Sequence, residues 1–419
     1  MAIDQKTIYV YTDWSSRTPT LMGMLYVSES RGKELFSFAY SKDWLLSGEV
    51  SFALDPDLFL YEGRQFVPLG KPLFGIFSDS CPDRWGRLLM NRKEAALART
   101  EGRKPRALTE SDYLLGVFDE TRMGALRFSL AEGGPFVSAE STTPVPPWAT
   151  LRALESASRA FESGEGEQED KWLHLLLAPG SSLGGARPKA SVRAPDGSLW
   201  IAKFPSKHDE WNIGAWEIVV HDLAIRCGLN VPEAELAVFS DTGATFLVKR
   251  FDRTGTRRIH FASAMALLGK TDGDAMEEVS YLHLASFIRS GSVWPKRDLY
   301  ELWKRLVFNI AVSNVDDHLR NHGFLLTKQG WALSPLYDVN PGIYGTSLSI
   351  NISMEDNTAQ FDLALETASY YDIDILHAKK TVDEIKKIIS TNWRALAANY
   401  GLSRGAIERM EPAFAMEYK

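Results

Sequence analysis

The stretch SNVDDHLRNHGFLLTKQGWALSPLYDVNP, residues 313–341, contains the pattern that decides the fold. It begins at the end of LWKRLVFNIAVSN, an apolar segment that predicts a helix. GFLLT and WALSP, joined by a turn at Lys328–Gly330, predict a hairpin that would carry Asp338 back toward the loop after the helix. Taken alone, the segment from Asp316 to Asn321 is equally well explained as a capped, solvated turn. The hairpin and Asp338 shift the interpretation toward a reactive site.

Protein kinases use these residue types in this order for phosphoryl transfer. An aspartate accepts the hydroxyl proton, an asparagine five positions later holds a metal ion, and an aspartate beyond a hairpin holds Mg²⁺. Asn321 follows Asp316 by five positions, so the spacing favours Asp316 over Asp317 as the base, and Asp317 is expected to brace the loop. Carboxylate and amide oxygens suit Mg²⁺, so Asn321 and Asp338 are the predicted metal ligands. His318, in the same loop, is also predicted to bind ATP.

The segment upstream contains the other parts that a nucleotide-binding lobe requires. LWIAKF places Lys203 at the end of a predicted strand, much like the kinase lysine. Glu217, in the helix predicted for NIGAWEIVVHDLAIRCGL, is a candidate partner for Lys203, although an ordinary exposed glutamate is slightly favoured. The loop GSSLGGARP is neither GxGxxG nor a Walker A motif, but its small residues allow backbone N–H groups to approach phosphate. Ser182, Gly184 and Gly185 are therefore expected to bind ATP.

ATFLVKRFDR, residues 244–253, fits an extended link between two lobes. Backbone groups near Lys249 and the ring of Phe251 are expected to hold the adenine. Arg250, Asp252 and Arg253 predict an ion-pair network that holds the lobes together, which we favour over a catalytic role.

Composition excludes several classes of protein. The 419 residues include only two cysteines, far apart, which argues against a disulfide framework and a Cys-rich zinc module. No apolar run approaches a membrane span, and the start lacks a signal-peptide pattern, so we expect a cytoplasmic protein with no membrane contact. With 47 Lys and Arg against 54 Asp and Glu, the net charge of -7 argues against bulk affinity for nucleic acid.

The order of predicted elements indicates an α+β, bilobal protein-kinase-like fold. It has a β-rich N-terminal lobe with an additional small N-terminal subdomain, and an α-helical C-terminal lobe. IYVYT, LMGMLYV and LFSFAY predict strands, and Asp83 and Thr109 are predicted to begin helices. KWLHLLLAPG predicts a further short helix ending at Gly180. The expected segments are an N-terminal subdomain at 1–130, a linker at 131–150, a nucleotide-binding lobe at 151–250 and a helical catalytic lobe at 251–419.

With these motifs in order, the chain resembles the HipA family of serine/threonine kinases, the toxin half of bacterial type II toxin–antitoxin pairs. The resemblance covers nearly the whole chain, except the acidic loop near 165 and the last stretch. The segments that carry it are SSLGGARPK at 181–189, KRFDR at 249–253, SNVDDHLRNHGFLL at 313–326, LSPLYDVNP at 333–341, DSCPDRWGR at 79–87 and DYLLGVFDETRMGALRF at 112–128.

The resemblance implies ATP and Mg²⁺ as cofactors, Asp316 as base, Asn321 and Asp338 as Mg²⁺ ligands, and Lys203 at the nucleotide phosphates. It implies autophosphorylation of Ser182, which would switch the kinase off by ejecting the loop. It also implies a helix-turn-helix antitoxin as partner, DNA contact through that antitoxin, and a protein substrate such as a tRNA-charging enzyme. Some members have Gln-Glu before the loop lysine, whereas Arg187-Pro188 precedes Lys189 in this chain.

Two other functions compete with this interpretation. The first is a catalytically quiet co-repressor that scaffolds a DNA-bound antitoxin. The segment 84–106 holds eight Arg or Lys against two Glu and could face DNA, although a solvated helix face is favoured. The second is a metal-dependent hydrolase with Asp316, Asp317, His318 and His322 as ligands, which would leave Lys203 without a role.

Overall fold

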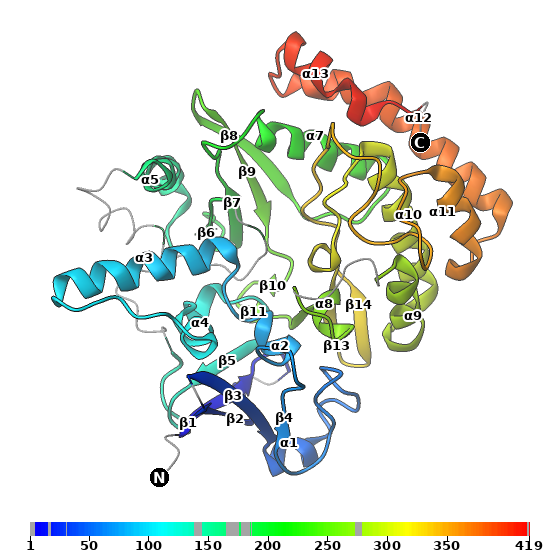
Figure 1. The fold of residues 1–419 in the computed structure, drawn as a ribbon. Coiled ribbons are helices and arrows are strands. Elements are labelled where there is room, and N and C mark those ends of the chain that lie inside the picture. Colours follow the sequence, from blue (N-terminus) through cyan, green and yellow to red (C-terminus); the bar gives the residue numbers. More distant parts are fainter. Residues whose placement is uncertain are drawn as a thin grey trace. The chain divides into compact units, whose positions relative to one another are not determined.

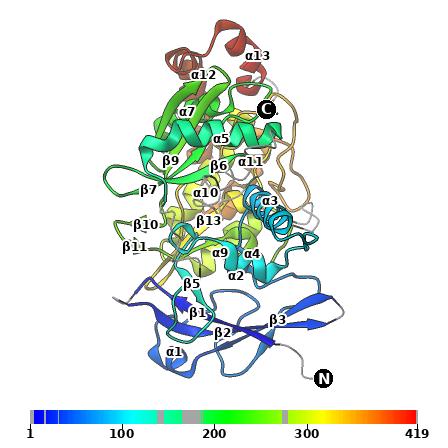
Figure 2. The same cartoon turned by 90° about the vertical axis from the view of Figure 1, so that its left-hand side faces the viewer.

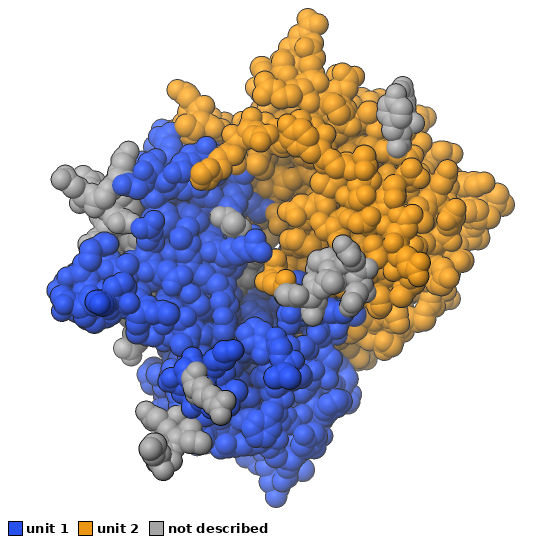
Figure 3. Space-filling model, viewed as in Figure 1, with its two compact units in different colours: residues 1–207, 250–271 blue, residues 208–249, 272–419 orange. Residues whose placement is uncertain are grey.

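The structure is a computed structural model (Figure 1). It describes residues 5–15, 18–30, 32–137, 145–164, 176, 185, 187–272, 279–416 and 419. The chain forms two compact units, coloured separately in Figure 3. Unit 1 comprises Met1–Lys207 and Arg250–Thr271, and unit 2 comprises His208–Lys249 and Asp272–Lys419. The four segments expected from the sequence stay a prediction.

The N-terminal part of unit 1 is an antiparallel sheet with strand order β4-β3-β2-β1-β5. Its alternating apolar residues point to one buried face, which is why Ile8, Leu25 and Phe38 are fully buried. Figure 2 shows α2 and α4 over this sheet, and Phe77 of α2 packs 5.3 Å from Phe38, ring centre to ring centre. The strands are β1 (Gln5–Thr12), β2 (Thr20–Ser30), β3 (Lys33–Tyr40), β4 (Gln65–Phe66) and β5 (Leu126–Ser129).

The helices of this part begin at side chains that cap their free backbone N–H groups. Asp83 accepts a 2.7 Å hydrogen bond from the N–H of Gly86, and Thr109 forms a capping box with Asp112. Both predicted helix starts are confirmed. The elements are α1 (Lys42–Ser47), α2 (Gly75–Ser78), α3 (Arg84–Thr100), α4 (Glu110–Gly116) and the 3₁₀ turn η1 (Asp119–Thr121).

Several arginines of the basic segment 84–106 form ion pairs with nearby acids. The three guanidinium groups approach their carboxylate partners within 2.5–2.6 Å. These charges are therefore partly compensated within the unit, which supports the favoured interpretation of a solvated helix face. The pairs are Arg87–Glu110, Arg103–Glu94 and Arg106–Asp112.

The rest of unit 1 is built on the predicted hairpin of β6 and β7. Lys189 pairs with Lys203 in its register, so the predicted strand-end lysine is the last residue of β7. The predicted helix that ends at Gly180 falls largely outside the described residues. The elements are η2 (Trp148–Thr150), α5 (Leu151–Ser163), β6 (Lys189–Arg193), β7 (Leu199–Lys203), β10 (Arg253–Thr254), β11 (Arg257–Arg258), β12 (Phe261–Ser263) and α8 (Ala264–Leu267).

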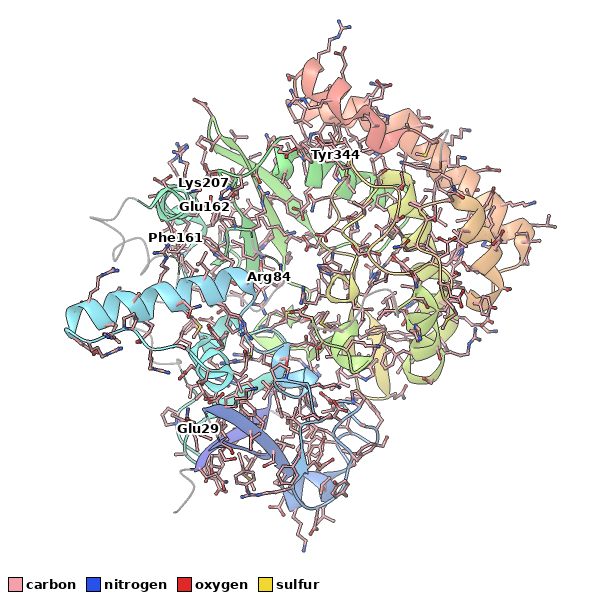
Figure 4. All side chains as sticks on the ribbon, in the orientation of Figure 1. Glu29, Arg84, Phe161, Glu162, Lys207 and Tyr344 are labelled. Atoms are coloured by element: carbon pink, nitrogen blue, oxygen red, sulfur yellow. The ribbon has the colours of Figure 1, made fainter. Side chains whose placement is uncertain are left out.

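Helix α5 is tied to the chain that follows β7. The carboxylate of Glu162 accepts hydrogen bonds from the hydroxyl of Ser206 at 2.7 Å and from the backbone N–H of Lys207 at 3.0 Å. Figure 4 shows Glu162 and Lys207 side by side. On the same helix, the ring of Phe161 meets the ring of Trp85 edge-on at 5.4 Å, which joins α5 to α3.

Unit 2 is organised around α10, whose inward face is apolar and fully buried at Leu302, Trp303 and Leu306. The predicted hairpin at 323–334 and the stop of α7 before Gly228, which has a φ of 69°, are confirmed. The elements are α7 (Ile213–Arg226), β8 (Ala234–Ser240), β9 (Gly243–Lys249), α9 (Tyr281–Gly291), α10 (Pro295–Val312), η5 (Leu319–Asn321), β13 (Gly323–Thr327), β14 (Gly330–Leu333), α11 (Phe361–Thr367), η6 (Ala368–Tyr371), α12 (Ile375–Asn399) and α13 (Arg404–Phe414).

Aromatic side chains pack the last two helices of unit 2 against α7. The rings of Trp393 on α12 and Phe414 on α13 stack at 4.5 Å, and Trp216 on α7 lies 6.4 Å from Trp393. In the described part of the chain, no helix combines the length and the apolar character that a membrane crossing requires.

Candidate active site

The loop that follows α10 begins where Ser313 takes a left-handed backbone conformation, with a φ of 53°. This residue ends the helix and turns the chain. Asp316 is then exposed, whereas Asn321 has only 6% of its surface accessible. The side-chain Nδ2 of Asn321 donates a 3.0 Å hydrogen bond to the backbone oxygen of Asp316. This bond closes the loop and leaves the Oδ1 atom as the acceptor that Asn321 can offer to another group.

Asp317 is buried, with 2% of its surface accessible, and its carboxylate is held by two side chains. It accepts a hydrogen bond from the hydroxyl of Tyr281, and its Oδ1 atom lies 3.0 Å from Nε2 of His322. Burial alone would raise the pKa of Asp317, but His322 and Tyr281 outweigh it and hold that pKa below its ordinary value. Asn309 donates to the hydroxyl of Tyr281 at 3.1 Å, which extends the network into α10. The prediction that Asp317 braces the loop is confirmed.

Asp338 lies in a segment that is bonded to this loop on both sides. Before it, the hydroxyl of Tyr337 donates to the backbone oxygen of Arg320 at 2.6 Å. After it, the N–H of Asn340 approaches Oδ1 of Asn314 at 3.4 Å. The hairpin of β13 and β14 thus returns Asp338 beside the loop, as its position in the sequence predicts. Asp338 has a φ of 59°, a strained conformation for a residue other than glycine, and such strain gathers at functional sites.

The donor set of this loop fits Mg²⁺. An amide oxygen from Asn321 and a carboxylate from Asp338 are the hard oxygen ligands that this ion prefers, and water and phosphate oxygens ordinarily complete its shell. Within the described ranges, no three His, Cys, Asp or Glu side chains gather as a metal site. Asp317 and His322 instead bond to each other in the core of unit 2. The hydrolase interpretation, which needs both as metal ligands, therefore gains no support.

The loop also contains a buried polar atom that fits a ligand. Nδ1 of His318 is buried and has no hydrogen-bond partner in the described part of the protein. A buried nitrogen of this kind ordinarily has a partner, so its position is consistent with the expected contact to ATP.

In unit 1, the end of the glycine-rich loop is anchored to the start of α3. Nζ of Lys189 lies 2.8 Å from the carboxylate of Asp83 in a buried ion pair, and it donates to the oxygen of Gly185 at 3.3 Å. Nε1 of Trp85 donates to the backbone oxygen of Lys189 at 3.0 Å. Asp83 and Trp85 were not among the predicted site residues. The sequence showed the DRWG stretch as a helix cap and as part of the family resemblance, but its distance from the loop along the chain concealed the contact.

The remaining predicted site residues are only partly described. Ser182 and Gly184 lie outside the described residues, whereas Gly185 has a φ of 95° that favours glycine. The N–H of Lys249 donates to the oxygen of Glu233 at 2.9 Å, so an adenine contact through Lys249 would use its carbonyl group. The ring of Phe251 is half-buried, and its binding role stays a prediction.

Glu217 is buried, with 3% of its surface accessible. The slightly favoured expectation of an ordinary exposed glutamate is therefore wrong. The following residues of α7, Ile218, Val219 and Val220, are buried as well, so this helix is covered on nearly all sides and not on one stripe. A buried carboxylate calls for a compensating partner. Lys203 belongs to unit 1 and Glu217 to unit 2, and their pairing stays a prediction.

The family model described as the HipA-like C-terminal domain matches residues 181–396, which is more than half of the chain. The chain belongs to the HipA family. The match runs from the glycine-rich loop through α12 and includes the loop of Asp316 and the segment of Asp338.

Known proteins support this membership and the fold. The chain is 28% identical over 197 residues to "Putative kinase Y4mE" of Sinorhizobium fredii, covering 41% of this chain and 45% of that protein. It is 27% identical over 179 residues to "Putative kinase" of Haemophilus influenzae, covering 38% and 52%. The matches thus span about half the length of these relatives.

A solved structure of the Shewanella oneidensis MR-1 toxin–antitoxin system, a complex of HipA, HipB and operator DNA, contains a chain with the same fold. The two chains superpose with a TM-score of 0.65 at 18% sequence identity, covering 96% of this chain and 97% of that one. The expected fold class is confirmed.

Proposed function

We propose that this HipA-family chain is an ATP- and Mg²⁺-dependent serine/threonine protein kinase. One observation carries the proposal: the 3.0 Å bond from Asn321 to the backbone of Asp316 closes the loop, and the segment of Asp338 is bonded to it on both sides. This arrangement supports the proposal, because the candidate base and the two candidate metal ligands follow one another in the order that phosphoryl transfer uses. The two relatives that are named as kinases add support to the proposal.

Each residue has a role that its surroundings permit. Asp316 is exposed, so a serine or threonine hydroxyl of a substrate protein can reach its carboxylate and lose its proton there. Asn321 and Asp338 would hold Mg²⁺, which supplies positive charge that neutralises the phosphate oxygens. Lys203 would contact the phosphates. The residues expected to complete the ATP site are Ser182, Gly184, Gly185, Lys249, Phe251 and His318, with Glu217 as the candidate partner of Lys203.

The proposed physiological role is that of a growth-arresting toxin, neutralised by a helix-turn-helix antitoxin. Its substrate would be a protein of the translation machinery, such as a tRNA-charging enzyme, which would place the activity in the cytoplasm. The Shewanella oneidensis complex of HipA with HipB and operator DNA supports an antitoxin partner, with DNA reached through it. That complex also favours a second candidate, a catalytically quiet co-repressor, which predicts antitoxin binding without phosphate transfer.

Replacing Asp338 with asparagine is expected to raise the Mg²⁺ concentration for half-maximal phosphate transfer by about tenfold or more, because a charged ligand becomes neutral. Asparagine tolerates the left-handed backbone, so the segment keeps its conformation. Asp372→Asn is the matched control, since Asp372 also has a left-handed φ of 61° and pairs with Arg289 at the surface. An unchanged Mg²⁺ requirement in Asp338→Asn would refute the ligand assignment.

Autophosphorylation is expected at Ser182. A phosphate there would add about two negative charges to a loop expected to bind phosphate, and like charges would repel. Mass spectrometry of the chain after incubation with ATP and Mg²⁺ should detect a phosphopeptide that contains Ser182. Ser182→Ala should abolish that signal, while Ser181→Ala should keep it. Phosphate found only on other residues would remove Ser182 from the proposal.

A further inference from the structure

The segment that links β9 to β10 carries a buried carboxylate with an unusually complete set of partners. Asp252 is fully buried and accepts hydrogen bonds from Nη2 of Arg250 at 2.7 Å, Nη1 of Arg253 at 2.5 Å and the backbone N–H of Gly124 at 2.8 Å. A buried charge is costly unless it is paired and hydrogen-bonded, and here it is both. Burial alone would raise the pKa of Asp252, but the two arginines outweigh it and bring the pKa to about 2.

The two arginines bind the backbone of a distant stretch of the chain. Arg250 donates to the oxygens of Thr121 at 2.6 Å and Arg122 at 3.1 Å. Arg253 donates to the oxygens of Arg122 at 2.7 Å and Gly124 at 3.0 Å. Residues 121–124 belong to the N-terminal segment that precedes β5. The network expected to hold the lobes together instead fastens the link to this N-terminal stretch, and the whole arrangement lies within unit 1.

The close fit requires glycine at position 124. Its φ is 73°, and a Cβ added there would come within 3.0 Å of the backbone nitrogen of Phe261. Residue 124 is therefore packed closely against β12, which leaves little freedom for the stretch 121–124 to shift.

The same link is attached to the strand that ends in the candidate phosphate-binding lysine. The N–H of Arg250 donates to the oxygen of Leu199, the first residue of β7, at 2.9 Å, and Lys203 is the last residue of that strand. Phe251, the candidate adenine contact, lies between the two residues whose side chains are held in the network. Phe251 is thus flanked by a direct backbone bond from Arg250 to β7 and by the side-chain network of Asp252, which holds both of its neighbours.

We propose that residues 121–124 of the N-terminal segment position the link for nucleotide through Asp252, which makes Asp252 a positioning residue for ATP binding. This inference rests on the proposed kinase function. It assigns the N-terminal segment a role in the nucleotide site that the order of motifs along the chain does not suggest. The carboxylate is fully buried and acts through Arg250, Arg253 and the backbone.

The test compares Asp252→Asn with Asp119→Asn in the full chain. Asp119 is a matched control, because it is another buried carboxylate of the same region, paired with Arg127 at 2.6 Å and Arg258 at 3.0 Å and not with residues 250–253. Asp252→Asn is expected to raise the KM for ATP by about tenfold while kcat changes by less than about threefold. Asp119→Asn is expected to lower the melting temperature and to leave the KM for ATP within about twofold of the original chain.

Isothermal titration calorimetry with ATP and Mg²⁺ should show the same tenfold loss of ATP affinity in Asp252→Asn. A folded Asp252→Asn that binds ATP as tightly as the original chain, or an equal loss in both variants, would overturn the inference and leave the kinase proposal intact. An original chain that binds no ATP would refute the kinase proposal itself, and this inference with it.

If Asp252→Asn does not melt cooperatively, amide hydrogen exchange on the unaltered chain tests the positioning role instead. ATP with Mg²⁺ is expected to slow exchange in a peptide spanning 119–125 and to leave a β3 peptide spanning 33–40 unchanged. Equal exchange with and without ATP at 119–125 would contradict the positioning role.

Discussion

Asp316→Asn is expected to lower the rate of phosphate transfer from ATP by about a hundredfold to ten-thousandfold, the range that a positioned general base contributes. The amide has no basic oxygen that can take the proton of the attacking hydroxyl. Asp316 is exposed, so the substitution removes no packing, and the melting temperature should stay within about one degree. The measurement is transfer of the γ-phosphate from labelled ATP, followed beside a thermal melt.

Asp362→Asn is the control for this change. Asp362 is an exposed aspartate in the first turn of α11, so its loss should leave both transfer and melting nearly unaltered. Full transfer activity in Asp316→Asn would eliminate Asp316 as the base and, with it, the main support for the kinase proposal. If the original chain transfers no phosphate yet binds its antitoxin, the co-repressor becomes the better explanation.

The same substitution at Asp317 is expected to lower the stability of the chain far more than its phosphate transfer, the reverse of the effect expected at Asp316. Asp317→Asn should lower the free energy of unfolding by about 2–4 kcal/mol, because its carboxylate accepts from both Tyr281 and His322 in the core of unit 2. An amide can satisfy only one of these donors and brings a donor of its own. Urea denaturation followed by tryptophan fluorescence measures the change in stability.

Phosphate transfer by Asp317→Asn, assayed well below its melting temperature, should fall far less than in Asp316→Asn. The two variants form a matched pair, since they make the same chemical change in adjacent residues of one loop. A stable Asp317→Asn chain without transfer activity would exchange the roles of the two aspartates.

Much of the local structure could be predicted from the sequence. The apolar run LWIAKF, read as a hairpin strand, placed Lys203 at a strand end, and Asp83 and Thr109 were recognisable as helix caps. The five-residue spacing from Asp316 to Asn321 also singled out Asp317 as the aspartate that braces the loop. These features depend on residues close together in the chain, where backbone hydrogen bonding and side-chain periodicity operate.

Burial and distant partners could not be predicted in this way. Glu217 looks like an ordinary surface glutamate within its helix, yet the packing around α7 buries it.

The sequence by itself determined the order of the motifs and the strands and helices that carry them. It also showed that the loop after α10 contains two adjacent aspartates. Only the tertiary structure decided that Asp252 is held by residues 121–124, and that Asp83 anchors Lys189. The physical reason is that a charged side chain shows its type in the sequence but not its partner. The partner is selected when non-local packing removes both groups from water and makes their pairing necessary.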